Sequence, residues 1–297
     1  MSSADDALIE HAARQNRLLE DILQVLKVQG QAIAKIQEES VTTRRLVDGL
    51  KTMASQPLLD EVRRAFHGKQ LSFMDTLHAI SAESLSFARF GDGELRNMFR
   101  PEYSIYFQRN SAELSSDLKA AFAGEGASNL LIGLPQIFAD HLHWNVVLHE
   151  LWSDMKAYVG ELPRFGNLHV TRPVAFQAHG DDLVDAWRHI WDDREVLIVT
   201  GKGSRFELEP DLFDNLRAWR FEHSLPRDAY SDLNRVEQAA VDAPEKMVLI
   251  SLGPAGSVLA HRLAKAGKQA LDLGHLSSSY ANVMKGGAFP ERTAVAR

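Results

Sequence analysis

Two carboxylates flanked by glycines follow an apolar stretch that ends at Phe90. From Arg89 the chain reads Arg-Phe-Gly-Asp-Gly-Glu, with Gly91 directly before Asp92 and with Glu94 at the end of the run. Carboxylates one residue apart can bind a Mg²⁺ or Mn²⁺ ion that also bridges the phosphates of a substrate. The same two acids also suit the first turn of a helix, where negative side chains are favoured. The residues by themselves leave both interpretations open.

A basic loop follows the apolar stretch Glu195–Thr200. It begins with Gly201 and Lys202 and reaches Arg205. Backbone N–H groups near the glycines, together with these two cations, could hold phosphate groups. The loop is not a Walker A sequence, which has the spacing G-x-x-x-x-G-K-[ST]. The alternative is a solvated basic loop that binds no ligand.

Small residues join the apolar stretch Met247–Leu252 to a helical pattern that begins near Gly256. Gly253 and Pro254 lie at this junction. Free N–H groups at the start of a helix attract anions, and small residues let an anion come close. The dinucleotide fingerprint G-x-G-x-x-G is absent, so a dinucleotide site is not indicated. A tight turn that binds no ligand is the alternative.

An acidic residue and a histidine lie at the end of the last apolar stretch, Gln269–Leu273. Asp272 is inside that stretch, and His275 follows it after Gly274. A histidine in this place can ligate a metal ion or donate a hydrogen bond to a phosphate. A single histidine is, however, more often structural.

Short apolar stretches alternate with helical patterns along residues 57–297. Stretches of this kind are typical of parallel strands that are covered by helices on both faces. We therefore predict an α/β fold with a Rossmann-like, mostly parallel sheet and helices on both faces. In such sheets ligands bind beyond the carboxyl ends of the strands, which is where the four loops lie. The predicted strands are Ser86–Phe90, Asn129–Leu134, Glu195–Thr200, Met247–Leu252 and Gln269–Leu273, and the predicted helices include Phe73–Glu83, Ser111–Ala123, Asp181–Ile190, Asp211–Ala218, Ser231–Val241 and Gly256–Ala266.

The first 56 residues differ in composition from the rest of the chain. Every aromatic residue and all ten prolines come after Gln56, whereas a globular core normally needs aromatic bulk. Steps of four and three residues from Leu8 to Leu50 reach thirteen positions, of which nine are apolar. This heptad pattern predicts a self-associating coiled coil over residues 1–56; the alternative is one amphipathic helix that lies on its own globular domain. Residues 57–297 suffice for one sizeable core, so we predict a second domain there.

Composition excludes several classes of protein. The chain has no cysteine, which rules out disulfide scaffolds, thiol nucleophiles and cysteine-ligated metal centres and favours oxygen-ligated Mg²⁺ or Mn²⁺. The net charge of −7 argues against non-specific binding of nucleic acid. No apolar run approaches a transmembrane segment, and the acidic N-terminus does not start a signal peptide. We therefore expect the protein in the cytoplasm, either free or at the inner face of the membrane.

Taken in order, the four loops make the sequence resemble the GT-D type of bacterial glycosyltransferase. That family has an Arg-Phe-Gly-Asp-Gly-Glu stretch containing its D-x-E motif and then a Gly-basic-Arg loop with an Asp-Leu-Phe segment beyond it. It ends with a Leu-Gly-Pro turn before a helix and an Asp-x-Gly-His strand end. The corresponding segments here begin at Arg89, Gly201, Leu252 and Asp272, and the resemblance covers Ser72–Tyr280.

The resemblance implies a metal-dependent transferase that moves a sugar from a nucleotide-diphosphate donor, usually a UDP-sugar such as UDP-glucose, to a glycan or glycoconjugate acceptor. It assigns catalysis to Asp92 and Glu94 and a Mn²⁺ or Mg²⁺ site to Asp92, Glu94 and His275. The residues expected to bind the donor are Arg89, Gly91, Arg172, Gly201, Lys202, Arg205, Gly253, Pro254 and Asp272. The expected partners are the donor, the acceptor and further copies of the chain that associate through residues 1–56.

Two other functions fit the same residues. The family pattern has acidic residues after its Gly-His pair, whereas here His275 is followed by Leu276 and three serines. This departure favours a catalytically silent binding module whose coiled coil mediates assembly. A nucleotide phosphohydrolase is the third interpretation, and such an enzyme would hydrolyse the donor whatever its sugar.

Overall fold

The computed structural model describes residues 3–136 and 142–292. The chain divides into two compact units, Met1–Pro57 and Leu58–Arg297, and each is described by itself. No helix in the described part of the chain is both long enough and apolar enough to cross a membrane.

The first unit is helical. Helix α1 spans Ser3–Phe66, so it runs past the predicted boundary at residue 57, and its residues up to Pro57 belong to this unit. The larger apolar side chains of the heptad pattern are 41–66% exposed, because a single helix buries none of its faces. Burial of this seam requires another helix, and the coiled coil stays a prediction. The exposed seam residues are Leu19, Ile22, Leu26, Ile33, Ile36, Val47 and Leu50.

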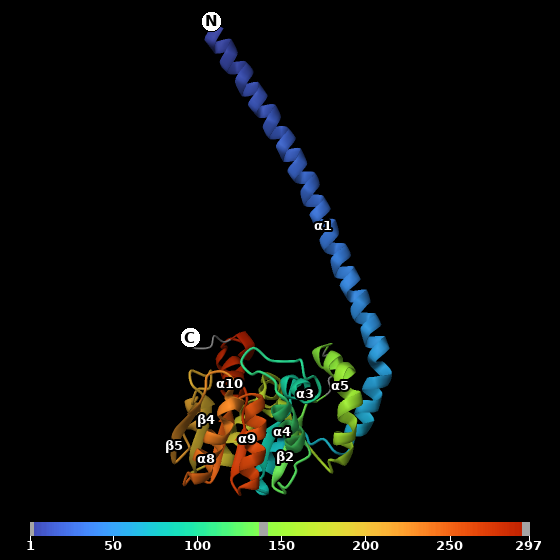
Figure 1. Ribbon diagram of the computed structural model, residues 1–297. Coiled ribbons are helices and arrows are strands. Elements are labelled where there is room, and N and C mark those ends of the chain that lie inside the picture. The colour runs from blue at the N-terminus through green and yellow to red at the C-terminus, as the bar shows by residue number, and fades with distance from the viewer. Residues whose placement is uncertain (1–2, 137–141, 293–297) are drawn as a thin grey trace. The chain divides into compact units, whose positions relative to one another are not determined.

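The second unit is built around a seven-stranded sheet with the order β3-β2-β1-β7-β6-β4-β5 (Figure 1). Every neighbouring pair of strands is parallel, which confirms the predicted α/β class. The direction of winding reverses at β1, and ligands bind beyond the carboxyl ends of strands at such a reversal. The strands are β1 (Ser86–Arg89), β2 (Leu130–Leu134), β3 (Gly166–Asn167), β4 (Glu195–Gly201), β5 (Ala218–Ser224), β6 (Met247–Ser251) and β7 (Gln269–Asp272).

Helices cover both faces of the sheet, as predicted. Successive side chains of a strand point to opposite faces, so Leu197 and Val199 of β4 pack in one core and Ile198 packs in the other. One face carries α3 (Asp92–Phe99), α4 (Ala112–Phe122), α5 (Leu142–Glu161), α8 (Leu233–Asp242) and α9 (Pro254–Lys265). The other carries α2 (Phe73–Ala82), α6 (Pro173–Trp191), α7 (Pro210–Phe213) and α10 (Leu276–Lys285).

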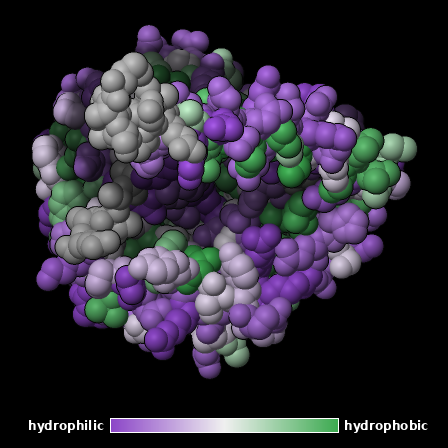
Figure 2. Space-filling view, turned by 90° about the horizontal axis from the view of Figure 1, so that it is seen from above, coloured by the Kyte–Doolittle hydropathy of each residue, from purple (hydrophilic) through white to green (hydrophobic). Residues whose placement is uncertain are grey.

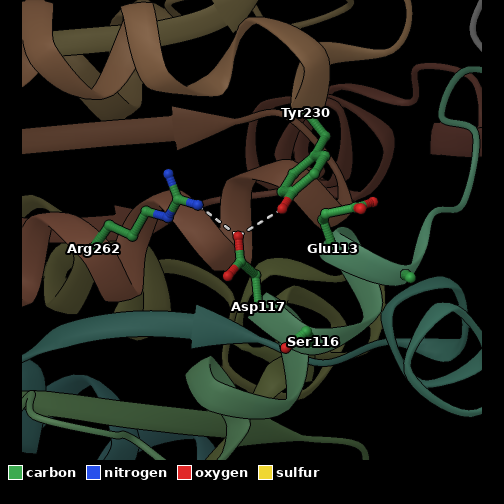
Figure 3. A pocket seen from close by; sticks show the side chains of 6 residues that line it. Glu113, Ser116, Asp117, Tyr230 and Arg262 are labelled. Carbon is green, nitrogen blue, oxygen red and sulfur yellow. Dashed lines mark hydrogen bonds and ion pairs between the residues drawn. The ribbon is translucent and has the colours of Figure 1, made fainter.

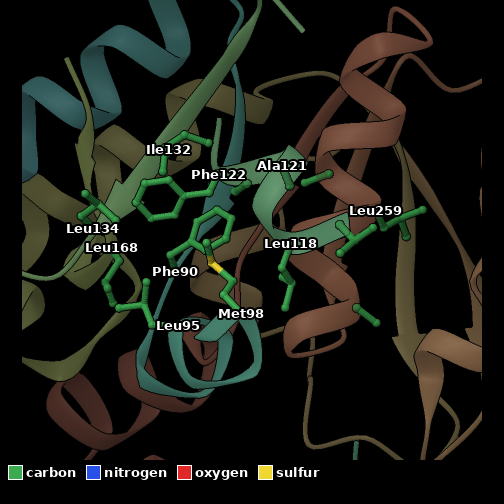
Figure 4. Close-up of a cluster of buried hydrophobic side chains, with 14 of the residues drawn as sticks. Phe90, Leu95, Met98, Leu118, Ala121, Phe122, Ile132, Leu134, Leu168 and Leu259 are labelled. Carbon is green, nitrogen blue, oxygen red and sulfur yellow. The ribbon is translucent and has the colours of Figure 1, made fainter. Parts of the chain in front are cut away.

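Phe90 fixes the point at which the chain leaves β1. Its ring is fully buried and meets Phe122 of α4 edge to face, with 4.8 Å between the ring centroids. Met98 and Ile132 lie in the same cluster (Figure 4). Burying an aromatic side chain contributes several kcal/mol, roughly 3–5 by the cost of its removal. Because Phe90 directly precedes Gly91, this packing also positions the glycine-rich turn.

The structure differs from the predicted elements mainly at the edges of the sheet. Residues 211–218, predicted as one helix, contain the end of the short helix α7 and the first residue of strand β5. The alternation of large and charged residues from Trp219 to Glu222 has a period of two, which is the strand signal that the prediction misses. Strand β3 has only two residues and is too short to carry a pattern. The structure also contains helices α5 and α10, which are not among the predicted helices.

The burial of one histidine lets us predict how the free energy of unfolding depends on pH. His261 lies in α9, is 4% exposed, and places Nε2 2.8 Å from the carbonyl oxygen of Glu125. Burial lowers the pKa of His261 below its ordinary value. The unfolded chain therefore binds a proton, below about pH 6.5, that the folded chain does not bind. The free energy of unfolding should fall as the pH drops below that value, by up to about 1.4 kcal/mol per pH unit.

Urea unfolding at about pH 8 and about pH 5 measures this effect in the wild type and in His261→Gln. The wild type should lose more stability on acidification than the variant. His67→Gln, at an exposed histidine, is the matched control and should keep the wild-type dependence. An equal loss in all three proteins would contradict the assignment.

Candidate functional site

The D-x-E residues form the first turn of α3, directly beyond the carboxyl end of β1. The backbone N–H of Gly91 donates to Glu94 Oε2 at 2.9 Å. A Cβ added at Gly91 would lie 2.9 Å from that same oxygen, so glycine lets the Glu94 side chain fold back over the helix start. Glu94 is partly buried, and its other carboxylate oxygen, Oε1, does not take part in this bond. The helix-start interpretation is thus correct, and it leaves room for the ligand interpretation.

Asp92 contacts side chains from two helices. Its Oδ2 lies 3.4 Å from Arg96 Nη1 of α3 and 3.4 Å from His143 Nε2 of α5. The Asp92 side chain is 40% exposed. It is therefore held loosely at the surface and is accessible to a ligand from solvent.

A buried ion pair joins the ends of β1 and β7 behind these carboxylates. Arg89 Nη1 lies 3.9 Å from Asp272 Oδ1, and the Asp272 side chain is only 3% exposed. Asp272 Oδ1 also accepts a hydrogen bond from the backbone N–H of Gly274 at 3.0 Å. Ser257 Oγ of α9 lies 2.6 Å from the Arg89 carbonyl oxygen and 3.2 Å from Asp272 Oδ2. Ser257 therefore links three elements, and no sequence motif singled it out.

The Arg89 side chain occupies the space that a side chain at position 274 would need, so this position requires glycine. Its φ is +49°, and a Cβ added there would lie 1.7 Å from Arg89 Nη1. No other residue fits this position while the guanidinium stays in place. Arg89 Nε also donates to the carbonyl oxygen of Leu168 at 3.3 Å, so the arginine is held from two sides.

Negative charge is in excess around this buried pair. Burial, and after it the neighbouring Asp272 carboxylate, raises the pKa of Glu94 to about 7. Burial also raises the pKa of Asp272 and lowers the pKa of Arg89. Because Asp92 adds further negative potential at Glu94, an added cation would favour the ionised form of Glu94.

Positive charge gathers at a second part of the same edge. Arg172 directly precedes α6, and Arg205 lies in the loop after β4. Burial, reinforced by the charges of Arg172 and Arg89, lowers the pKa of His275 well below its ordinary value. A neutral histidine among guanidinium groups can donate a hydrogen bond to an anion.

The predicted metal ligands do not come together as a group of three. Among the described residues, no three His, Asp or Glu side chains are arranged to hold a metal ion. His275 lies among arginines, which repel a divalent cation, whereas Asp92 and Glu94 are on α3. The ligand set Asp92, Glu94 and His275 therefore stays a prediction.

The other predicted donor-binding residues all follow strands at the carboxyl edge. Gly201 ends β4, and the exposed Lys202 donates its backbone N–H to the Ser224 carbonyl at 2.9 Å. Gly253 has a φ of +56° and precedes Pro254, the first residue of α9. A Cβ at Gly253 would lie 2.7 Å from the Phe107 ring, so the loop after α3 packs directly on this turn.

Figure 2 shows that most of the surface visible from above is hydrophilic. Carboxylates and arginines at the carboxyl edge of the sheet suit a charged, hydroxyl-rich ligand better than an apolar one.

A separate open pocket of about 510 Å³ lies between α4, α9 and the residues around Tyr230 (Figure 3). Asp117 accepts a hydrogen bond from Tyr230 Oη at 2.6 Å and pairs with Arg262 Nη2 at 2.5 Å. Arg262 also pairs with Glu237. These groups satisfy one another, which indicates that they connect the helices rather than carry out chemistry.

The chain resembles proteins that are named as glycosyltransferases. It is 28% identical over 247 residues to the glycosyltransferase GlyD of Streptococcus pneumoniae serotype 4, a match that covers 80% of this chain and 30% of GlyD. It is 29% identical over 227 residues to the probable glycosyl transferase Gly of Streptococcus gordonii, covering 71% of this chain and 32% of that protein. The chain thus matches about a third of the length of these relatives.

Two solved structures share the fold. One is a domain of unknown function 1792 described as having a distinct glycosyltransferase fold, with a TM-score of 0.70 and 24% identity over 78% of this chain and 87% of that one. The other is a glycosyltransferase of the same domain class from Streptococcus sanguinis, with a TM-score of 0.67 and 28% identity over 74% of this chain and 85% of that one. The family model of the glycosyltransferase GT-D fold matches residues 87–289, which include every predicted site residue. The chain therefore belongs to the GT-D fold family of glycosyltransferases, as its D-x-E turn and its three later loops predict.

Proposed function

We infer that the protein transfers a sugar from a nucleotide-diphosphate donor, a UDP-sugar such as UDP-glucose, to a glycan or glycoconjugate acceptor. The observation that carries this proposal is that a pair of carboxylates and a group of arginines lie at the same edge of the sheet. Asp92 and Glu94 supply carboxylates on α3, and Arg172 and Arg205 supply cations beside His275. Family membership supports the same chemistry.

The carboxylates fit a divalent metal ion that is shared with the donor. Mg²⁺ and Mn²⁺ prefer oxygen ligands, and Mg²⁺ is usually held by one or two carboxylates together with waters and substrate phosphates. Asp92 and Glu94 offer that donor set, and the excess of negative charge at Glu94 would be relieved by a cation. When bound, the metal would neutralise charge that develops on the departing diphosphate.

The arginines would stabilise the same leaving group. As the bond between the sugar and the diphosphate breaks, negative charge grows on the phosphate oxygen, and guanidinium donors that already face it lower the barrier. Arg172 and Arg205 supply such donors. The acceptor hydroxyl forms the new bond to the sugar carbon and gives up its proton. Glu94 or Asp92 could accept that proton as general base.

Removal of the first carboxylate tests this assignment. In calorimetric titrations with UDP, the wild type should bind more tightly with Mn²⁺ than without it. Asp92→Ala should lose about tenfold or more of the affinity measured with Mn²⁺, because a charge-assisted contact contributes about 1.5 kcal/mol or more. Glu195→Gln, a carboxylate at the opposite end of β4, should bind like the wild type. Equal affinity of the Asp92→Ala and wild-type proteins would refute the role.

Gly274→Ala tests whether the donor site needs the position of Arg89. The added methyl group would displace the guanidinium and also strain a left-handed residue. We expect weaker UDP binding and a loss of more than about 1 kcal/mol in the free energy of unfolding. Gly267→Ala is the matched control, because φ is +81° there and no heavy atom lies within 4 Å of the added Cβ. The control should lose some stability but keep its UDP affinity; if both variants keep it, Arg89 is not required.

The heptad seam of residues 1–56 is proposed to make the protein an oligomer. Multi-angle light scattering should show more than one chain in the wild type and a monomer after removal of residues 1–56. Ile33→Asp, on the seam, should weaken assembly because a charge would enter a buried interface. Val28→Asp is the matched control, since Val28 is off the seam and similarly exposed in one chain, 54% against 56%. A monomeric wild type would end this proposal.

A further inference from the structure

The segment that follows α10 folds back over the cationic part of the site. Gly287 donates its backbone N–H to the Ala281 carbonyl at 2.9 Å, and Asn282 Nδ2 donates to the Gly287 carbonyl at 2.8 Å. These bonds tie the start of the segment to α10. Pro290 beyond them is buried, whereas Glu291 is exposed.

Both arginines proposed to bind the donor contact this segment. Arg172 Nη2 donates to the Glu291 carboxylate, and Arg205 Nη1 donates to the Pro290 carbonyl oxygen at 2.8 Å. The Phe289 ring centroid lies 6.0 Å from the Arg172 guanidinium carbon. The Arg172 side chain is only 18% exposed, while that of Glu291 is 50% exposed. The arginine is thus the fixed member of the pair.

Resting on the proposed function, we propose that Glu291 competes with the donor diphosphate for Arg172, and that its carboxylate marks the position of a phosphate. A carboxylate and a phosphate oxygen bind a guanidinium in the same way. Glu291 also lies close enough to His275 to interact with it electrostatically, so the carboxylate is within the cationic cluster. It lies beyond residues 87–289, which match the family model.

The exchange is favourable because a diphosphate carries more charge than one carboxylate. A half-exposed ion pair is weak in water, and a multiply charged anion that reaches Arg172, Arg205 and His275 together gains several contacts. Glu291 therefore acts as a built-in competitor that lowers the affinity for anions.

The test compares the wild type with Glu291→Gln, which removes the charge and keeps the side-chain shape. Each full-length protein is titrated calorimetrically with inorganic pyrophosphate without metal, and separately with UDP and Mn²⁺. The variant should bind pyrophosphate about fivefold more tightly, and the gain should shrink at high salt because the competing pair is screened. Glu83→Gln is the matched control, because Glu83 pairs with Arg164 at the amino end of β1, and it should not change either affinity.

Every outcome of these titrations either supports or overturns the proposal that Glu291 competes with the diphosphate. Weaker pyrophosphate binding in Glu291→Gln would mean that the carboxylate orients Arg172 for the ligand and does not compete, which overturns the proposal. Unchanged binding, or no binding to either protein, would also overturn it. Tighter pyrophosphate binding without any UDP binding would support the competing carboxylate and refute the nucleotide-sugar function, so the two proposals fail separately.

Discussion

The buried pair of Arg89 and Asp272 is the interaction on which the site depends. It connects the carboxyl ends of the central strands β1 and β7, and Ser257 of α9 completes it from the helix layer. Removing one partner of a buried ion pair typically costs about 3–5 kcal/mol, because the other charge is left without compensation. Gly274 supplies both an N–H for Asp272 and the space that Arg89 occupies. The residues that border the site are therefore positioned by a charge pair that water hardly reaches.

Around this pair the fold separates charges of opposite sign. Helix α3 starts beside β1 and presents Asp92 and Glu94, while α6 and the loop after β4 present Arg172 and Arg205. A chain with a net charge of −7 can therefore contain a cationic cluster, because a site depends on the few groups within reach and not on the total. The Glu291 carboxylate in this cluster shows that an anion is already accommodated there.

Much of this arrangement follows from local sequence signals. Apolar stretches between glycine-rich loops predict the parallel strands, and the order of the loops identifies the family. The prediction of His275 as a metal ligand does not take into account the arginines around it, which are distant in the sequence. It also missed Ser257 and Glu291, since a single serine in a helix and a single acid near the end of the matched region carry no pattern. Strand β5 did carry a period-two pattern, and a predicted helix was placed over its first residue.

The sequence by itself determined most of the elements, the family and the residue types at the carboxyl edge. Those properties depend on neighbours a few residues apart, through strand and helix periodicity and through turns that need glycine. Only the tertiary structure decided which of these residues meet. Gly274 against Arg89, Ser257 against Asp272 and Glu291 against Arg172 join residues separated by 15 to 185 positions. Such contacts arise when the whole sheet is assembled, because burial and the pairing of charges act on groups that are close in space, whatever their separation along the chain.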